Sequence, residues 1–272
     1  MSANRMSQSR KQDAIGFPPP LMGEEPIRLP VLAETDEWLA LYKLGGLALR
    51  EYPWDTQPNL DAALNRQLQA GKPELVNRGA SIFGSVYYMD PAISGVALFG
   101  KQRESLAELR NHFGSGDMDF RFTFVSGAKP NELEDRFTAD APLLPHDVKP
   151  KMIPSTAKGK KSFTDFELLS ESLAGYTLWE ARASFFRVHQ VRAHAAVHGI
   201  PVLGDDLYGG SHVPTQRELM PKKRGAGLDV VAFQGLALHL NQCQLDDEAQ
   251  VICSFSKQMQ LFIKRLGLEA ED

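Results

Sequence analysis

The chain has 272 residues, 43% of them apolar, so it can bury a full hydrophobic core as one large domain or two small ones. Its formal net charge of -4 argues against a dedicated nucleic-acid-binding protein, which is usually basic overall, so any basic surface has to be local. No apolar run approaches the roughly 20 residues needed to span a bilayer, and the N-terminus lacks the apolar core of a signal peptide. We therefore expect a cytoplasmic protein that does not enter a membrane.

The two cysteines indicate the same compartment. Cys243 and Cys253 are ten residues apart and have neither the spacing of a metal-binding pair nor a disulfide framework around them. We expect both to be buried, unreactive thiols in a reducing interior.

The first part of the chain differs in composition from the rest. Residues 1–28 are polar and then rich in proline, so they bury too little apolar surface to offset the entropy lost on ordering. We expect a flexible N-terminal arm over residues 1–28 and one domain over residues 29–272. Arg5, Arg10 and Lys11 make the arm weakly basic, and a solvated tail explains them better than a nucleic-acid contact.

The domain begins with alternating strand and helix patterns. Two apolar runs separated by an acidic turn predict paired strands within residues 31–49, and leucines at fourfold spacing predict an amphipathic helix over residues 58–70. Aromatic and β-branched residues favour a strand over residues 81–89, followed by a second strand at residues 96–99. Asp90 then lies at a strand end beside a turn, although an aspartate before a proline is more often only a turn former.

The same periodicities predict the remaining elements. We expect helices at residues 102–113 and 256–267, and strands at residues 120–125, 163–170, 176–184, 236–245 and 251–255. In the first of these strands, period two places Phe120, Phe122 and Phe124 on one side and Arg121 on the smaller, more polar side. The order is too irregular for a doubly wound parallel sheet, so we predict an α+β fold with a mixed, largely antiparallel central sheet.

A basic segment interrupts this pattern. Residues 128–161 have the composition of a loop, and the run from residue 148 to 164 contains no acidic residue. Such a segment is usually a solvated surface, yet several cations on one rim are what phosphate contact requires. The lysines of this segment are Lys149, Lys151, Lys158, Lys160 and Lys161.

Residues 185–209, FFRVHQVRAHAAVHGIPVLGDDLYG, carry more polar chemistry than a core helix needs. The pattern predicts a short helix with Gly199 as its C-terminal cap. His194 and His198 are four residues apart and could bind a metal together with Asp205 or Asp206, but this pair alone is a weak signal. A hydrolase would need a nucleophile motif that is absent from the sequence.

A third interpretation is a buried carboxylate held by an arginine in a cleft lined by aromatic and basic residues. The guanidinium would keep the carboxylate ionised, and the cleft would accept a flipped nucleotide. Composition alone does not choose among the three interpretations.

Two motifs decide the choice by resemblance. Residues 185–209 resemble the Gly-Arg-x-His-Gln-Ile-Arg-x-His and Gly-x-Pro-Ile-x-Gly-Asp-x-x-Tyr-Gly signature of the RluA-like RNA pseudouridine synthases. The matching residues are Arg187, His189, Gln190, Arg192, His194, Gly199, Pro201, Gly204, Asp205, Tyr208 and Gly209. In residues 87–101, YYMDPAISGVALFGK resembles the His-Arg-Leu-Asp-x-x-Thr-Ser-Gly-x-x-Leu-x-x-Lys motif of the same family and places its catalytic aspartate at Asp90.

The resemblance implies an RNA pseudouridine synthase fold with an RNA-binding cleft, and isomerisation of uridine to pseudouridine in a structured ribosomal or transfer RNA. Asp90 would be the nucleophile and Arg192 the residue that holds it ionised. Arg187, His189 and Gln190 would bind the substrate, and the five lysines would meet phosphate. No metal or organic cofactor is required, and we expect a monomer with RNA as its partner.

The sequence departs from the family pattern around Asp90. The family's His and Arg before the catalytic aspartate are Tyr87 and Tyr88, and its Thr is Ile93. Because the family associates that Arg with base flipping, we expect Tyr88 to stack in its place, contributing about 1 to 3 kcal/mol. Arg121 aligns with the family's stacking tyrosine and would substitute for it. The alternative function is a catalytically degenerate RNA-binding or ribosome-assembly factor of the same fold.

Overall fold

The computed structural model describes residues 13–220, 222, 224, 225 and 227–270. Within these residues it contains an eleven-stranded sheet with the order β1-β2-β3-β5-β12-β6-β11-β10-β7, in which β4 pairs with β5 and β13 with β12, and a separate pair of β8 and β9. The strands are β1 (Ala14–Phe17), β2 (Ile27–Glu34), β3 (Trp38–Lys43), β4 (Gly84–Ser85), β5 (Ser94–Gly100), β6 (Asp119–Ser126), β7 (Arg136–Ala139), β8 (Leu143–Pro145), β9 (Met152–Pro154), β10 (Thr164–Glu171), β11 (Thr177–Ala183), β12 (Leu238–Gln244) and β13 (Gln250–Ile252). In this part of the chain the β5–β12 pairing is parallel and every other strand pairing is antiparallel. The predicted mixed, largely antiparallel sheet is confirmed.

The helices begin and end at residues suited to those positions. Side chains of Asn59 and Ser256 accept hydrogen bonds from backbone N–H groups at the starts of α1 and α6, and Gly116 in the left-handed conformation ends α3. The helices are α1 (Leu60–Gln69), α2 (Pro73–Val76), α3 (Arg103–Ser115), α4 (Gln190–Val197), α5 (Gln216–Leu219) and α6 (Lys257–Arg265).

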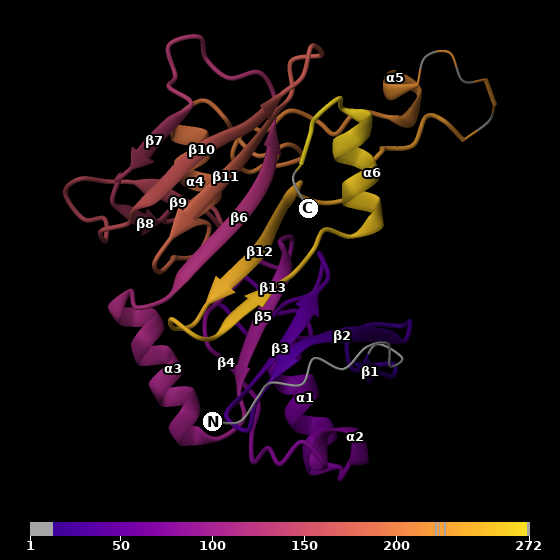
Figure 1. Ribbon diagram of the computed structural model, residues 1–272, viewed down its shortest axis with the longest axis vertical. Coiled ribbons are helices and arrows are strands. Elements are labelled where there is room, and N and C mark those ends of the chain that lie inside the picture. The colour runs from indigo at the N-terminus through magenta and orange to yellow at the C-terminus, as the bar shows by residue number, and fades with distance from the viewer. Residues whose placement is uncertain (1–12, 221, 223, 226, 271–272) are drawn as a thin grey trace.

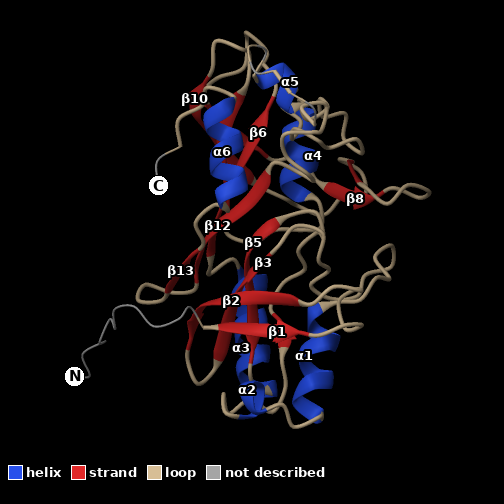
Figure 2. Cartoon of the chain, turned by 90° about the vertical axis from the view of Figure 1, so that its right-hand side faces the viewer, coloured by secondary structure: helices blue, strands red, loops and turns tan. Residues whose placement is uncertain are grey.

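The sheet runs through the whole length of the molecule and joins two halves (Figure 1). The lower half in this view contains β1 to β5 with α1, α2 and α3, and the upper half contains β6 to β11 with α4, α5 and α6. In the side view, α4 and α1 lie on one side of the sheet and α6 lies on the other (Figure 2). Strands β5 and β12 meet at the junction between the halves.

Alternation along β6 assigns its side chains to these two sides. Phe122 and Phe124 belong to the large core cluster that also contains Val191 of α4. Val125, one residue further along, belongs instead to the cluster formed with Phe262 and other residues of α6. Successive side chains of a strand point to opposite faces, so one face of β6 looks toward α4 and the other toward α6.

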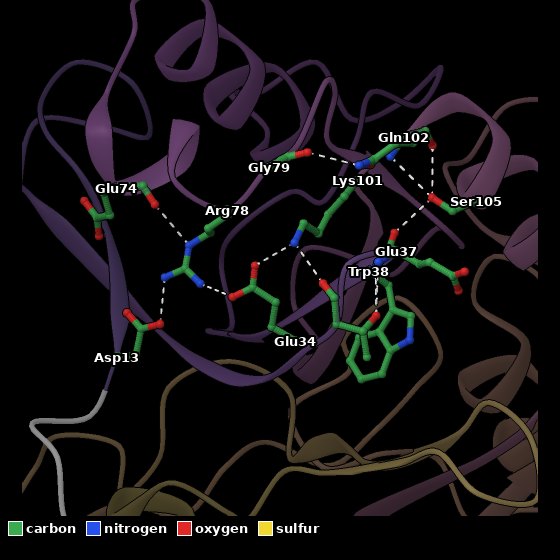
Figure 3. A network of polar contacts seen from close by, with 11 residues as sticks. Asp13, Glu34, Glu37, Trp38, Glu74, Arg78, Gly79, Lys101, Gln102 and Ser105 are labelled. Carbon is green, nitrogen blue, oxygen red and sulfur yellow. Dashed lines mark hydrogen bonds and ion pairs between the residues drawn. The ribbon is translucent and has the colours of Figure 1, made fainter. Parts of the chain in front are cut away.

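A polar network ties the lower half together (Figure 3). The ammonium of Lys101, only 2% exposed, donates to Glu34 at 2.9 Å and to the carbonyl of Thr35 at 2.8 Å. Arg78 pairs with Glu34 and with Asp13, so the end of β2, the segment after α2 and the start of α3 are joined through one carboxylate. A buried ammonium is tolerated here because it has both a charge partner and a carbonyl acceptor.

Most predicted elements are confirmed, including every predicted helix and the hairpin of β12 and β13. Two predictions are wrong. Residues 81–89 contain only the two-residue strand β4, because β5 pairs with β3 on one edge and its other edge is taken by β4 and then β12. Residues 128–161, predicted as loop, include the short strands β7, β8 and β9.

The predicted N-terminal arm is wrong in its later part. Residues 14–17 form β1, which pairs with β2 from Ala14 opposite Pro30 to Phe17 opposite Ile27. Ile15 and Phe17 are fully buried, and this burial supplies the apolar contact that the polar composition had hidden. Residues 1–12 lie outside the described residues. None of the helices that the structure describes combines the length and the apolar character needed to cross a membrane.

Candidate functional site

Asp90 lies at the junction of the two halves, as the first residue of the turn over residues 90–93 that leads into β5. The residue is 2% exposed, and its backbone carbonyl accepts a hydrogen bond from the N–H of Ile93 at 3.1 Å. Lys43 stabilises this turn, because its ammonium donates to the carbonyls of Pro91 at 2.9 Å and Ile93 at 2.5 Å. The predicted carboxylate is therefore held by a turn whose carbonyls are bound by a buried cation.

Arg192 of α4 connects Asp90 to a second buried carboxylate. Its Nη1 donates to Asp90 Oδ2 at 3.1 Å, while Nε and Nη2 donate to the two oxygens of Asp205 at 2.7 and 2.8 Å. The Asp205 side chain is fully buried. Burial alone would lower the pKa of Arg192, but its hydrogen bonds to Asp205 and the charge of Asp90 raise it well above the ordinary value. Arg192 is thus permanently charged, and its three hydrogen bonds fix the orientation of the guanidinium group.

His189 begins α4 with an unusual backbone. It has φ of 56°, the one positive φ among non-glycine residues that the structure describes. This left-handed conformation turns its backbone N–H toward Asp90 Oδ1 at 3.4 Å. Burial lowers the pKa of His189 against the opposing effect of Asp90, so the ring is neutral at pH 7. Arg192 is then the charged partner of Asp90 on this helix.

Tyr208 holds the ring of His189 in place. Its hydroxyl is 3.1 Å from His189 Nδ1, accepts from the N–H of Met152 at 2.7 Å and donates to the carbonyl of Met152 at 3.2 Å. The Arg192 guanidinium lies 5.1 Å from the ring centroid of Tyr208, within range of a cation–π contact. Burial raises the pKa of Tyr208 well above its ordinary value, so it stays a neutral donor.

A cavity of about 450 Å³ opens beside Asp90. Asp90, His189 and Arg192 line it from one side, and its other walls include Trp54 and Asp55 of the lower half. Further lining comes from Thr56, Gln57, Pro91, Ala92, Pro150 and Leu207. This volume lies in the range of small-molecule sites and is large enough for one nucleotide.

Tyr88 is brought to the site but not as predicted. It lines a small neighbouring cavity with Asp90, yet it is only 6% exposed. Its hydroxyl donates to Asp55 and its ring lies 4.6 Å from that of Tyr52, centroid to centroid. Tyr88 therefore does not present a free ring for the predicted stacking, because both its ring and its hydroxyl are already engaged.

Arg121 is not brought to the site. It lines a different cavity, with Thr123 and Glu180, on the face of β6 that looks toward α6. Phe122, the next residue, faces the Asp90 side instead. The prediction that Arg121 shapes the base pocket is wrong. Its alignment with the family's stacking tyrosine selected the wrong face of the strand, although the alternation had placed the phenylalanines opposite it.

Gln190 and Arg187 hold the segments around α4 together. The Gln190 amide donates to the carbonyl of Phe163 at 2.8 Å and accepts from the N–H of Arg187 at 3.0 Å. Arg187 Nε donates to the carbonyl of Lys161 at 3.0 Å, which leaves its terminal nitrogens free of hydrogen bonds among the described residues. Gln190 is 1% exposed and so cannot reach RNA phosphate, whereas Arg187 can.

Four of the five predicted lysines are exposed: Lys149, Lys158, Lys160 and Lys161. Lys151 is half-buried, with its ammonium 5.7 Å from the Tyr208 ring centroid. Pro150 lines the cavity beside Asp90 and the backbone of Lys161 contacts Arg187, so this basic segment borders the site at both of its ends.

The histidine pair does not form a metal site. His194 Nδ1 is 2.9 Å from Thr164 Oγ1 and its Nε2 is 2.9 Å from the carbonyl of Ala141, so both ring nitrogens are occupied. His198 packs against Phe137, and Asp205 is bound to Arg192. Over the described parts of the chain, no group of three or more potential metal ligands is present.

The sequence analysis missed three contributors: Lys43, Trp54 and Asp55. Lys43 ends the strand β3 just before the Gly45-Gly46 bend, and that position was the available signal. The segment of residues 50–58 carried no signal of its own, because only folding places Trp54 and Asp55 beside Asp90.

The chain is similar in sequence to known proteins. The chain is 28% identical over 264 residues to ribosomal large subunit pseudouridine synthase D of Zymomonas mobilis, covering 93% of the chain and 77% of that relative. It is 30% identical over 186 residues to the synthase D of Xanthomonas campestris, covering 68% and 53%, and 29% identical over 180 residues to the synthase C of Vibrio vulnificus, covering 66% and 52%. The chain thus spans about half the length of the last two relatives. No family model matches it.

Solved structures agree on the fold. The human protein RNA pseudouridylate synthase domain containing 4 has a TM-score of 0.67 at 16% identity, covering 89% of this chain and 94% of that one. The human protein RNA pseudouridylate synthase domain containing 1 has a TM-score of 0.58 at 17% identity, covering 84% and 83%. The chain is homologous to the RluA-like RNA pseudouridine synthases. The resemblance drawn from residues 87–101 and 185–209 is confirmed at the level of the family.

The buried pairing of Asp205 with Arg192 predicts that substitutions of the two adjacent aspartates, Asp205 and Asp206, change the free energy of unfolding by very different amounts. Asp205→Asn removes the bidentate charge partner and faces an amide NH₂ toward the guanidinium, so we expect the free energy of unfolding to fall by about 3 kcal/mol. Asp206→Asn, at the exposed neighbour, should change it by less than about 0.5 kcal/mol. Urea denaturation measures both, and equal effects would contradict the arrangement.

Lys43 predicts a pH dependence of stability. Burial lowers its pKa from 10.5 to about 7, against the opposing effect of Asp90. Between these values the unfolded chain holds a proton that the folded chain does not, so stability from this group rises with pH from about 7 to 10.5. The stability of the wild type minus that of Lys43→Met should therefore increase between pH 7 and pH 10 in urea denaturation. Parallel stability curves for the two proteins would refute it.

Proposed function

We propose that this protein isomerises uridine to pseudouridine in structured RNA, with Asp90 as the nucleophile. The observation that carries the proposal is a buried carboxylate bound by a permanently charged arginine at the wall of a nucleotide-sized cavity. The bond between N1 of the uracil and C1′ of the ribose breaks, the base turns while held in the cavity, and a bond forms between C5 and C1′. Substrate and product have the same atoms, so no cofactor enters the balance.

Arg192 keeps Asp90 in the form that the reaction needs. A nucleophilic carboxylate has to be ionised, and burial by itself favours the protonated acid. The guanidinium, fixed by Asp205, supplies the opposite charge 3.1 Å from Asp90. The backbone N–H of His189 adds a donor on the other carboxylate oxygen. Both donors belong to the first turn of α4, and they leave the side of Asp90 that lines the cavity open to the substrate.

RNA of the large ribosomal subunit is the substrate that we propose, because the relatives named above are large-subunit synthases. The basic segment reaches the cavity at Pro150, and the backbone of Lys161 contacts Arg187. The exposed lysines of this segment and Arg187 would bind the phosphates on either side of a flipped uridine. Residues 29–272 would form the catalytic domain, together with β1 and the start of β2, which belong to the same sheet. Phe122 and Phe186, which line the small cavity behind Asp90, would keep this side of the site dry.

The role of Asp90 is tested by pseudouridine mapping of total RNA from cells that lack the protein, complemented with the wild type, Asp90→Asn or Asp36→Asn. Asp36 is exposed in the turn between β2 and β3 and serves as the matched control. We expect a pseudouridine that is lost on deletion and restored by the wild type and Asp36→Asn, with Asp90→Asn lowering the rate on purified RNA more than about 10³-fold. RNA binding with no change at any site would instead support the catalytically degenerate RNA-binding factor.

The phosphate-binding role of the lysine segment predicts a change in salt dependence. Replacing Lys158, Lys160 and Lys161 together by Ala should weaken RNA binding and lower the slope of log affinity against log salt by about 2 to 3, because each phosphate contact contributes about 0.7 to 0.9. Fluorescence anisotropy over a salt series measures the slope.

The matched control removes three cations from the other side of the sheet. Lys257, Lys264 and Arg265 are exposed on α6. In the side view this helix lies on the opposite side of the sheet from α4 (Figure 2). Their triple replacement by Ala should leave the slope unchanged. Equal slopes for both triple variants would show that charge number alone, and not a phosphate path beside the site, governs binding.

A further inference from the structure

The isomerisation proposed above requires a second acid–base group besides Asp90. When C5 of the uracil bonds to C1′, C5 carries both the ribose carbon and its original hydrogen. That proton has to leave C5, its electron pair returns to the ring, and N1 has to gain a proton. Asp90 is engaged with Arg192 and His189 during the glycosidic step, so a different base has to meet C5.

Asp55 lies where such a base is needed. It lines the same 450 Å³ cavity as Asp90, from the wall contributed by the lower half. Its position is fixed by reciprocal backbone hydrogen bonds with Tyr52, at 2.9 and 3.3 Å, and by the donation of the Tyr88 hydroxyl to Oδ2. No hydrogen bond to Asp55 Oδ1 occurs among the described residues. One carboxylate oxygen is thus held while the other is open to the cavity.

Asp55 also differs from Asp90 in its charge environment. Its direct partner is a neutral phenol, whereas Asp90 is bound by a guanidinium. Desolvation raises the pKa of Asp55, and the nearby charge of Asp90 raises it further, against the opposing effects of Arg192 and Lys43. A carboxylate in this state accepts a proton more readily than one held ionised by an arginine.

The side chain of Trp54 independently indicates how a bound uracil would be oriented. Its indole N–H is buried and has no hydrogen-bond partner in the part of the chain that the structure describes, although Trp54 lines the cavity. A buried unpaired donor is costly, and a carbonyl of a bound ligand would satisfy it. In uracil the O4 carbonyl is adjacent to C5. Donation from Trp54 to O4 would therefore turn C5 toward Asp55, the next residue in the chain.

We propose that Asp55 is the general base that removes the C5 proton of the turned uracil, with Trp54 orienting the O4 edge. The C5–H bond breaks, the proton passes to Asp55 Oδ1, and N1 takes a proton from water. Asp55 then returns its proton to water, so atoms and charges balance. This inference rests on the proposed isomerase function and assigns a second catalytic residue within the same cavity.

The test is single-turnover pseudouridine formation on substrate RNA carrying hydrogen or deuterium at C5 of the target uridine. Asp55→Asn should lower the rate by about 10²-fold or more and raise the C5 isotope effect well above that of the wild type, because proton removal becomes rate-limiting. Asp36→Asn, at an exposed site, should match the wild type in both measurements.

Three outcomes overturn the inference in different ways. A slower Asp55→Asn with an unchanged isotope effect would show a structural role only, and an unchanged rate would show no role. RNA affinity, measured alongside, identifies a variant that has lost its fold. In that case Asp55→Glu, which keeps a carboxylate but displaces it, replaces Asp55→Asn: it should lower the rate and raise the C5 isotope effect, and a wild-type isotope effect would overturn the inference. A wild type that forms no pseudouridine would overturn the proposed function, and this inference with it.

Discussion

The buried guanidinium of Arg192, shared between two carboxylates, is the interaction on which the site depends. Removing an arginine and two aspartates from water costs several kcal/mol for each charge, and this cost is recovered only when every donor meets an acceptor in good geometry. Nε and Nη2 meet Asp205, and Nη1 meets Asp90, 102 residues away in the sequence. The pairing therefore joins the two halves of the molecule and also fixes the carboxylate of Asp90.

The sheet determines what surrounds this pairing. Strand β6 pairs with β12 beside the junction, and the alternation of its side chains gives one face to α4 and the other to α6. The phenylalanine face borders Asp90 and lowers the polarity behind it, which strengthens the attraction of Arg192 for the carboxylate. The polar face, with Arg121, is left on the far side. The same strand thus supplies an apolar wall to the site and excludes a competing cation from it.

The sequence predicted the parts of the site that local patterns encode. Asp90, Arg192 and the short helix between residues 188 and 199 followed from contiguous motifs, and the sheet class followed from alternation in strands such as β6 and β11. The predictions that failed concern residues whose neighbours are determined by the tertiary fold. The sequence could not reveal that Tyr88 donates to Asp55, or that Ile15 and Phe17 pair with β2, because the partners are distant in the chain. Arg121 failed for a different reason: a shift of one residue moves a strand side chain to the opposite face.

Tyr88, which stands where the family has an arginine, fits the contacts around Asp55. An arginine at this position would pair with Asp55, keep its carboxylate ionised and lower its pKa, which makes a carboxylate a weaker base. The tyrosine instead gives one neutral hydrogen bond and leaves desolvation and the charge of Asp90 to raise the pKa of Asp55. Its ring packs on Tyr52, whose neighbour Trp54 extends to within 5.8 Å of the His189 ring, centroid to centroid. With Asp55 as the proposed general base, the tyrosine two residues before Asp90 would leave this chemistry to the segment of residues 50–58 that packs against it.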